Sequence, residues 1–245
     1  MKKILFLMLF PLSLAAQNGV HVSMKMISSR GMDGTIEMYA DKPGRRLEIT
    51  LGSSQHPENR RNKSISLIRS TSPDSIVRMN ETNKTYAVMP FSRIASMDHQ
   101  KYTVKVLGEE KVNGRMCKHA QINGTTDTYE VWTSKDIDYE KFGTLLSVDP
   151  RWASPSRNQA LKDVGIDGFP IKTIQNNEHM GQTTLELLSI EKKNIDKSIF
   201  EIPEGYNSIQ SQFPAGMQNL TPQQRDSALK QMMQKQKQEK EEEKK

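Results

Sequence analysis

The chain has 245 residues, of which 35% are hydrophobic and only 6% aromatic, and its formal net charge at pH 7 is +6. This length is enough for one large domain with its own core, or for one domain and a tail. Basic residues alternate with acidic ones along the chain, which argues against a nucleic-acid-binding protein. The single cysteine, Cys117, excludes an intramolecular disulfide.

Residues 1–16 have the pattern of a secretory signal peptide. Lys2 and Lys3 precede an apolar run from Ile4 to Leu14, and two small residues follow. The run is shorter than the roughly 20 residues that span a bilayer, and no later stretch is long and apolar enough to do so. We therefore predict a protein without a transmembrane segment that is exported to the periplasm of a gram-negative bacterium, or secreted. A buried strand and a membrane anchor are the alternatives for this segment.

Six short strands are predicted between residues 20 and 89, because apolar and polar residues alternate with a period of two. Gly52–Asn62 is polar and is predicted to be a loop, whereas Asp41–Gly44 and Asn80–Lys84 have turn compositions. The strands are expected at Val20–Met26, Gly34–Tyr39, Leu47–Leu51, Ile65–Leu67, Ile76–Met79 and Thr85–Met89.

A second group of strands is predicted from Tyr102 to Asp136. Apolar residues alternate from Tyr102 to Val106 and again from Thr128 to Thr133. Asn113-Gly114 and Asn123-Gly124 are turn pairs, because both residue types tolerate positive φ. This stretch predicts a meander of half-buried strands at the centre of the protein.

Helical spacing is confined to the middle of the chain. It is weak over Phe91–His99, and it predicts short helices at Asp138–Val148 and Pro155–Val164. A last hairpin is expected from Ile171–Gln175 and Thr183–Lys192. Together these elements predict an α+β domain over residues 17–209, with about ten strands in a mostly antiparallel sheet and helices on one face. A closed two-layer sandwich is the alternative fold.

Residues 210–245 differ in composition from the domain. Thr221 is a suitable N-cap with Pro222 at the first helical position, and the residues beyond Gln234 are only Lys, Gln and Glu. We interpret the segment as a linker and a solvated helical tail. The alternative is a docking helix for a partner protein.

No catalytic motif, metal-ligand spacing or phosphate-binding loop is found, and we predict no cofactor, no metal and no enzymatic activity. Cys117 and His119 share a strand face, but no acidic partner accompanies them. Methionine is abundant, and its flexible thioether suits irregular apolar cavities. Met24, Met26, Met38 and Trp132 are the predicted lining of a ligand cavity; Val131 and Trp132 point to opposite faces, so only one of those two can line it.

Four motifs in order resemble an uncharacterised family of secreted bacteroidete proteins, defined as a domain of unknown function. They are Gly114–Lys118, Tyr129–Asp136, Phe169–Lys172 and Phe200–Tyr206, and the resemblance covers roughly Gly19 to Tyr206. The last motif, Phe-Glu-Ile-Pro-Glu-Gly-Tyr, is also similar to periplasmic lipoprotein carriers of the LolA/LolB type. That likeness implies a curved half-barrel whose concave side holds short helices and an acyl chain.

The leading hypothesis is therefore an exported, non-enzymatic envelope protein that binds an apolar or acylated ligand, a lipid or a lipoprotein, on the concave face. The alternative is a structural or interaction module that presents a sheet edge or the C-terminal helix to an envelope protein. A third possibility, a thiol enzyme built on Cys117 and His119, requires a reactive thiol.

Overall fold

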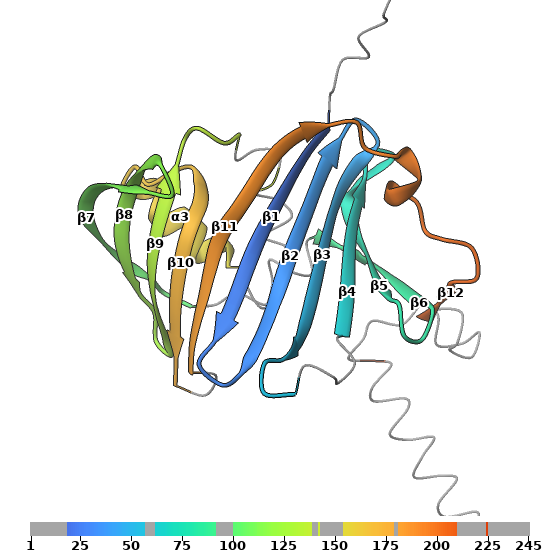
Figure 1. The fold of residues 1–245 in the computed structure, drawn as a ribbon, viewed down its shortest axis with the longest axis horizontal. Coiled ribbons are helices and arrows are strands. Elements are labelled where there is room, and N and C mark those ends of the chain that lie inside the picture. Colours follow the sequence, from blue (N-terminus) through green and yellow to red (C-terminus); the bar gives the residue numbers. More distant parts are fainter. Residues whose placement is uncertain are drawn as a thin grey trace, which may run out of the picture.

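A computed structural model of the chain describes residues 19–56, 62–91, 100–138, 142, 154–178, 181–209 and 224. Its main feature is one sheet of 12 strands in the order β12-β6-β5-β4-β3-β2-β1-β11-β10-β9-β8-β7 (Figure 1). All neighbours pair antiparallel except β12 and β6, which are parallel. The expected antiparallel sheet is confirmed as one large, open, curved sheet that fits a half-barrel, and the sandwich alternative is wrong.

The strands are β1 (Gly19–Ser28), β2 (Met32–Asp41), β3 (Gly44–Ser53), β4 (Asn62–Arg69), β5 (Ser72–Asn80), β6 (Thr85–Pro90), β7 (Thr103–Val112), β8 (Arg115–Asn123), β9 (Asp127–Ser134), β10 (Phe169–Asn177), β11 (Gly181–Lys193) and β12 (Asn207–Ser208). The described helices are α3 (Pro155–Asp163) and the 3-10 helix η1 (Lys197–Phe200).

The middle of the sheet is the pair β1 and β11, which lie about 160 residues apart in the sequence. The strands of the Tyr102–Asp136 stretch, β7 to β9, form one end of the sheet, so the prediction that they are its centre is wrong. Alternation of apolar and polar residues indicates that a strand has one apolar and one polar face. It does not indicate which strand, distant in the sequence, pairs with that strand. Only β7 of this group lies at the edge, and most of its residues are exposed.

The inner face of the sheet, defined here as the face on which α3 packs, carries the main core. Side chains alternate between the faces of a strand and cross-strand partners share a face. Met26 pairs with Leu185, which contacts the same cavity as α3, so the even-numbered apolar residues of β1 point to the inner face. The buried residues on this face of β1 to β5 include Val20, Val22, Met24, Ile36, Met38, Leu47, Ile49, Ile68 and Ile76.

The outer face is polar in the middle of the sheet and apolar near β4 to β6. In the middle, Glu37 accepts hydrogen bonds from His21 and Ser23. Toward β4 and β5, Leu67 and Val77 belong to a second buried cluster that is covered by residues 195–206, including Phe200 of η1. The C-terminal part of the domain thus closes over the outer face of its first half.

Helix α3 confirms the helix predicted at Pro155–Val164. Ser154 is its N-cap and accepts a hydrogen bond from the Arg157 backbone N–H, and Pro155 occupies the first helical position, where no N–H is needed. None of its residues is fully buried, and it lies behind β9 and β10 in Figure 1. The other two predicted helical segments lie almost entirely outside the described residues, which include only Phe91, Asp138 and Phe142 of them.

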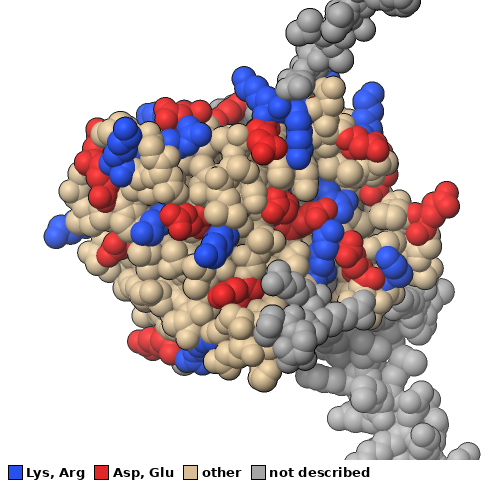
Figure 2. All heavy atoms as spheres, in the orientation of Figure 1, with Lys and Arg blue, Asp and Glu red and all other residues tan. Residues whose placement is uncertain are grey.

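The signal peptide predicted at residues 1–16 and the tail at 210–245 also lie outside the described residues, apart from Gln224. Across the described ranges, no helix is long and apolar enough to cross a membrane. On the visible face of the molecule, basic and acidic side chains are interspersed and no large patch of one sign forms (Figure 2).

Candidate functional site

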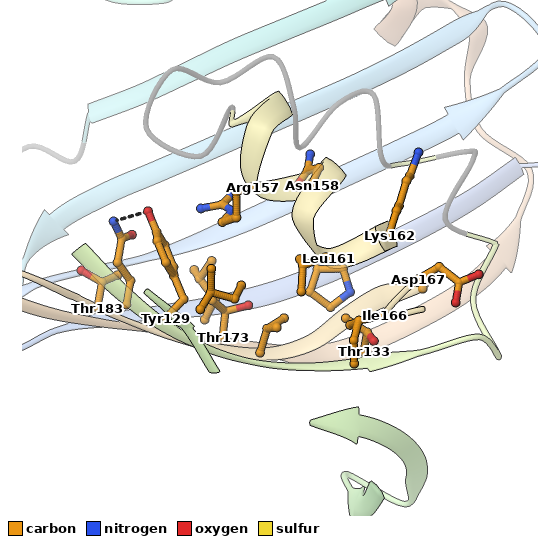
Figure 3. Close-up of a pocket in the computed structure, with 16 residues that line it drawn as sticks. Tyr129, Thr133, Arg157, Asn158, Leu161, Lys162, Ile166, Asp167, Thr173 and Thr183 are labelled. Atoms are coloured by element: carbon orange, nitrogen blue, oxygen red, sulfur yellow. Dashed lines mark hydrogen bonds between the residues drawn. The ribbon is translucent and has the colours of Figure 1, made fainter. Parts of the chain in front are cut away.

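A slot of about 120 Å³ lies between α3 and the inner face of the sheet, and we call it the α3 slot (Figure 3). Strands β8 to β11 form one wall, and α3 with the turn that follows it forms the other. Its lining residues are Ile122, Tyr129, Val131, Thr133, Arg157, Asn158, Leu161, Lys162, Ile166, Asp167, Gly168, Pro170, Thr173, Gln175, Thr183 and Leu185.

The middle of the α3 slot is apolar. Val131 of β9 and Leu185 of β11 contribute from the sheet, and Leu161 and Ile166 close the slot from the helical side. Period-two alternation puts Val131 on this face and Trp132 on the other. Ile166 is buried because the chain turns back after α3, where its backbone N–H donates to Leu161 O at 2.9 Å.

One end of the α3 slot is built around Tyr129. Its hydroxyl donates to Asp127 Oδ2 at 2.5 Å and accepts a hydrogen bond from Gln175 Nε2 at 3.1 Å. The guanidinium of Arg157 lies 4.5 Å from the centre of the Tyr129 ring, a cation–π contact. Burial raises the pKa of Tyr129 well above its usual value, so the phenol is neutral and donates. Asp127 Oδ1 is buried and has no hydrogen-bond partner in the described part of the chain.

The other end holds Lys162 and Asp167 (Figure 3). Asp167 forms an ion pair with Lys135 at 2.9 Å, and the hydrogen bond from Lys135 lowers the pKa of this carboxyl. Gly168 has a φ of +139°, and a Cβ there would lie 2.7 Å from Ser134 O. Glycine is therefore required where the chain passes β9 and enters β10.

The four residues predicted to line a ligand cavity are all buried, but none lines the α3 slot. Met26 comes nearest in register, because its cross-strand partner Leu185 is a lining residue. Met24 and Met38 are packed into the inner-face core. That these residues line a ligand cavity stays a prediction.

Trp132 does not line the α3 slot and belongs to the same buried cluster as Met24 and Met38. Its indole N–H donates to Glu110, the His119 ring stacks on it with centroids 4.2 Å apart, and the ammonium of Lys172 lies 5.1 Å from its ring centre. Of the two adjacent residues Val131 and Trp132, it is Val131 that lines the cavity.

Sequence reasoning missed the contribution of α3 to the slot. The helix has no apolar stripe, and Leu161 is its only large apolar lining residue. The signal that could have pointed to it is Arg157, which lies at the Tyr129 end of the slot (Figure 3). Lys162 also lines the slot, but its ammonium points away from the sheet.

A second cavity of about 420 Å³, the turn cavity, lies at the ends of β2 to β5. It is lined by Ala40, Asp41, Lys42, Gly44, Arg45, Ile68, Arg69, Ser70 and Pro73. The two turns that form it are joined by a hydrogen bond from Ser70 N to Pro43 O at 2.9 Å.

Cys117 and His119 are the residues on which a thiol enzyme would be built. Cys117 is 2% exposed, and burial raises the pKa of its thiol, which disfavours the reactive thiolate. His119 contacts Glu110 at 3.1 Å and Glu130 at 3.5 Å on the outer face. Within the described ranges, no cluster of three or more His, Cys, Asp or Glu side chains could hold a metal ion.

Comparison with known families identifies the chain. A family described as a domain of unknown function, DUF4412, matches residues 19–206. The chain belongs to the DUF4412 family. The match begins and ends at the same residues as the resemblance that the sequence motifs indicated. It ends at Tyr206, one of the residues that cover the outer face of the described domain. No curated protein matches the chain.

Solved structures show more distant likenesses. An uncharacterized conserved protein from Thermus thermophilus is 9% identical, with a TM-score of 0.46 over 79% of this chain and 91% of its own. A Vibrio parahaemolyticus structure described as a putative outer membrane lipoprotein-sorting protein domain is 11% identical, with a TM-score of 0.32 over 76% of this chain and 91% of its own. MucB is 11% identical, with a TM-score of 0.38 over 77% of this chain and 58% of its own. At these scores no function is carried over to the DUF4412 chain.

Proposed function

We propose that this DUF4412 protein is a non-enzymatic envelope protein that binds an apolar or acylated ligand on the inner face of its sheet. The observation that carries the proposal is the α3 slot, whose middle is apolar and whose helical wall places the cation Arg157 at one end (Figure 3). An acyl chain would lie against Val131, Leu161 and Leu185, and a carboxylate or phosphate at its end would lie near a cation. The buried, high-pKa thiol of Cys117 supports a non-enzymatic role.

The size of the slot limits how much of a ligand it takes. Its volume of about 120 Å³ is close to that of a ~150 Å³ cavity that holds one benzene ring. An alkyl segment of roughly six carbons therefore fills it. Each methylene that leaves water for such a site contributes about 0.8 kcal/mol, which is about fourfold in affinity.

Titration calorimetry with straight-chain fatty acids of increasing length tests the proposal. We expect affinity to rise about fourfold per methylene until the slot is filled, at roughly six carbons, and then to level off. The methyl ester of each acid is the control for charge, and it should bind more weakly because it lacks the carboxylate that Arg157 attracts. Absence of saturable binding at every chain length would contradict the proposal.

A pair of matched variants tests whether the ligand binds in the α3 slot. Leu161→Glu puts a carboxylate at the slot, where it must lose its hydration and repel the ligand's own carboxylate, so affinity should fall at least about tenfold. Leu188→Glu makes the same change at a side chain of β11 that is 57% exposed and outside the slot. Equal losses in the two variants would show that binding does not occur in the α3 slot.

An interaction module of the envelope is the second candidate, and the observation that favours it is the edge strand β7. Its outer side has no strand neighbour among the described residues, and Val106 and Leu107 on it are 50% and 44% exposed. Such an edge can accept a strand from a partner protein. Against this, β7 has a register shift between Val106 and Gly108 and carries Lys105, Glu109, Glu110 and Lys111, features that protect edges from pairing. The C-terminal helix, the other surface proposed for a partner, lies outside the described residues.

A further inference from the structure

The turn cavity gathers three cationic side chains at one end of the sheet. Lys42 lies in the turn between β2 and β3, Arg45 is the second residue of β3, and Arg69 is the last residue of β4, before the turn between β4 and β5. Both turns occur at the same end because β2 to β5 alternate in direction, and the hydrogen bond from Ser70 N to Pro43 O fixes them side by side. Gly44 allows β3 to pass close to the Ile68 carbonyl, where a Cβ would clash.

These three cations differ from other basic side chains of the domain that have acidic partners. Arg46 and Lys63 share Glu48, and Lys135 binds Asp167. By contrast, the side chains of Lys42, Arg45 and Arg69 form no ion pair or hydrogen bond with any described residue. The single carboxylate in the lining, Asp41, accepts a hydrogen bond from the Lys42 backbone N–H at 2.7 Å.

Arg69 gives the strongest indication of a missing partner. Its Nε is buried and has no hydrogen-bond partner in the described part of the protein. A buried donor without a partner loses its hydration without compensation, and in native proteins such a group commonly marks a bound ion or water. Like charges around one cavity also repel each other, so an anion that entered would relieve both effects.

We propose that the turn cavity is a binding site for an oxyanion, a phosphate or carboxylate group, held by Arg45 and Arg69 with support from Lys42. A guanidinium presents N–H groups in a planar fork that matches such oxygens. The cavity is larger than an inorganic ion needs, and Ala40, Ile68 and Pro73 give it an apolar wall. The oxyanion can therefore be a free ion or the head group of an amphiphile. The inference does not depend on ligand binding in the α3 slot, which is lined by different residues.

Calorimetry in a phosphate-free buffer of low ionic strength tests this site, because salt screens exposed charges. The probes are inorganic phosphate and dihexanoyl phosphatidic acid. Dihexanoyl phosphatidylcholine, which has the same acyl chains but no net charge, is the control ligand. The variants are Arg45→Gln and Arg69→Gln, and the matched control is Arg30→Gln, an exposed arginine in the turn between β1 and β2. All of these measurements are made in a Leu161→Glu background, which removes acyl binding in the α3 slot and leaves the turn cavity as the site measured.

We expect saturable binding of phosphatidic acid that weakens at least about tenfold in each cavity variant, because a charge-assisted hydrogen bond is lost. Arg30→Gln should leave this affinity unchanged. Equal affinity for inorganic phosphate would assign the site to the free ion, and tighter binding of phosphatidic acid would assign it to a head group. The inference is overturned by the absence of saturable binding of both anions, by equal binding of phosphatidylcholine, or by an equal loss in Arg30→Gln.

Discussion

Glu48 forms ion pairs with Arg46 and Lys63 on the outer face of the sheet, and these ion pairs stabilise that face. Its two carboxylate oxygens bind Arg46 Nε at 2.6 Å and Lys63 Nζ at 2.9 Å, and a second nitrogen of Arg46 donates to Ile199 O at 2.6 Å. Burial alone would raise the pKa of Glu48, but the hydrogen bonds and positive charges of Lys63 and Arg46 outweigh it and lower the pKa. The contact with Glu48 likewise outweighs burial and raises the pKa of Lys63.

Glu48→Gln is expected to lower the free energy of unfolding by about 1–3 kcal/mol at neutral pH, because Arg46 is left buried without its counter-charge. A carboxyl whose pKa is lower in the folded state stabilises the protein above its unfolded pKa and loses that effect as pH falls through the folded value. The difference between wild type and variant should therefore be constant from neutral pH to about pH 5 and shrink in more acidic solution. Urea unfolding at a series of pH values measures it.

Glu191→Gln is the control for the Glu48 experiment. Glu191 is 57% exposed and its contacts with His21 and Lys193 are 3.9 and 4.0 Å long, so its replacement should change stability by less than about 0.5 kcal/mol. A loss in Glu48→Gln that is the same at every pH would show that the carboxylate charge is not its cause.

The sequence predicted which face of a strand a residue points to only where apolar and polar residues alternate. The period of two correctly separated Val131 from Trp132 onto two faces, but it could not show which face has the cavity. The face with the cavity is decided by α3, which has no apolar periodicity of its own. Leu161 of α3 and Ile166, which follows the helix, pack with Val131 of β9. Met24, Met26 and Met38 are buried, as their inward positions in the strands predicted, whereas Met32 and Met116 are 51% and 59% exposed. The flexibility of methionine fits core packing as well as ligand binding.

The β7–β8 hairpin is the element whose turn was best determined by sequence. Asn113 and Gly114 have φ values of 48° and 79°, as a two-residue turn with positive φ at both positions requires. The hairpin tip also contacts a distant strand, because Asn113 Nδ2 donates to Leu187 O of β11 at 3.2 Å. This contact is not predictable locally, since it joins residues 74 positions apart.

Gly114→Ala should destabilise the protein by about 1 kcal/mol, because a side chain at positive φ is strained. No described atom lies within 4 Å of the Cβ that would be added, so the effect is conformational and not a clash. Gly114→Asn is the matched control, since asparagine tolerates positive φ, and it should recover part of the loss. Thermal unfolding of the two variants measures the difference, and equal destabilisation by both would contradict this explanation.

At the scale of the whole molecule, the fold depends on contacts between the ends of the domain. β1 pairs with β11 in the middle of the sheet, and β12 returns to β6 at its edge. Alternation predicted nearly all the long strands. Strand order requires knowing which strands pair across long separations, and a single sequence taken by itself gives no such signal. The Phe200–Tyr206 motif marked where the domain ends because those residues are needed to cover the outer face.

The C-terminal boundary of the domain follows from the same contacts and can be tested by truncation. Residues 195–206 cover the outer-face cluster, with Phe200 1% exposed, and they supply the Ile199 carbonyl that binds Arg46. A chain that ends at Asn194 would expose Leu67 and Val77 to water, and we expect it to lose its cooperative thermal transition. A chain that ends at Ile209 keeps every one of these contacts, so its Tm should match that of the full chain. The full-length Phe200→Ala variant gives the intermediate case, with an expected loss of about 3–5 kcal/mol for an aromatic ring removed from a core. Retention of the full-chain Tm by the chain ending at Asn194 would show that the outer-face cluster does not hold the two ends of the domain together.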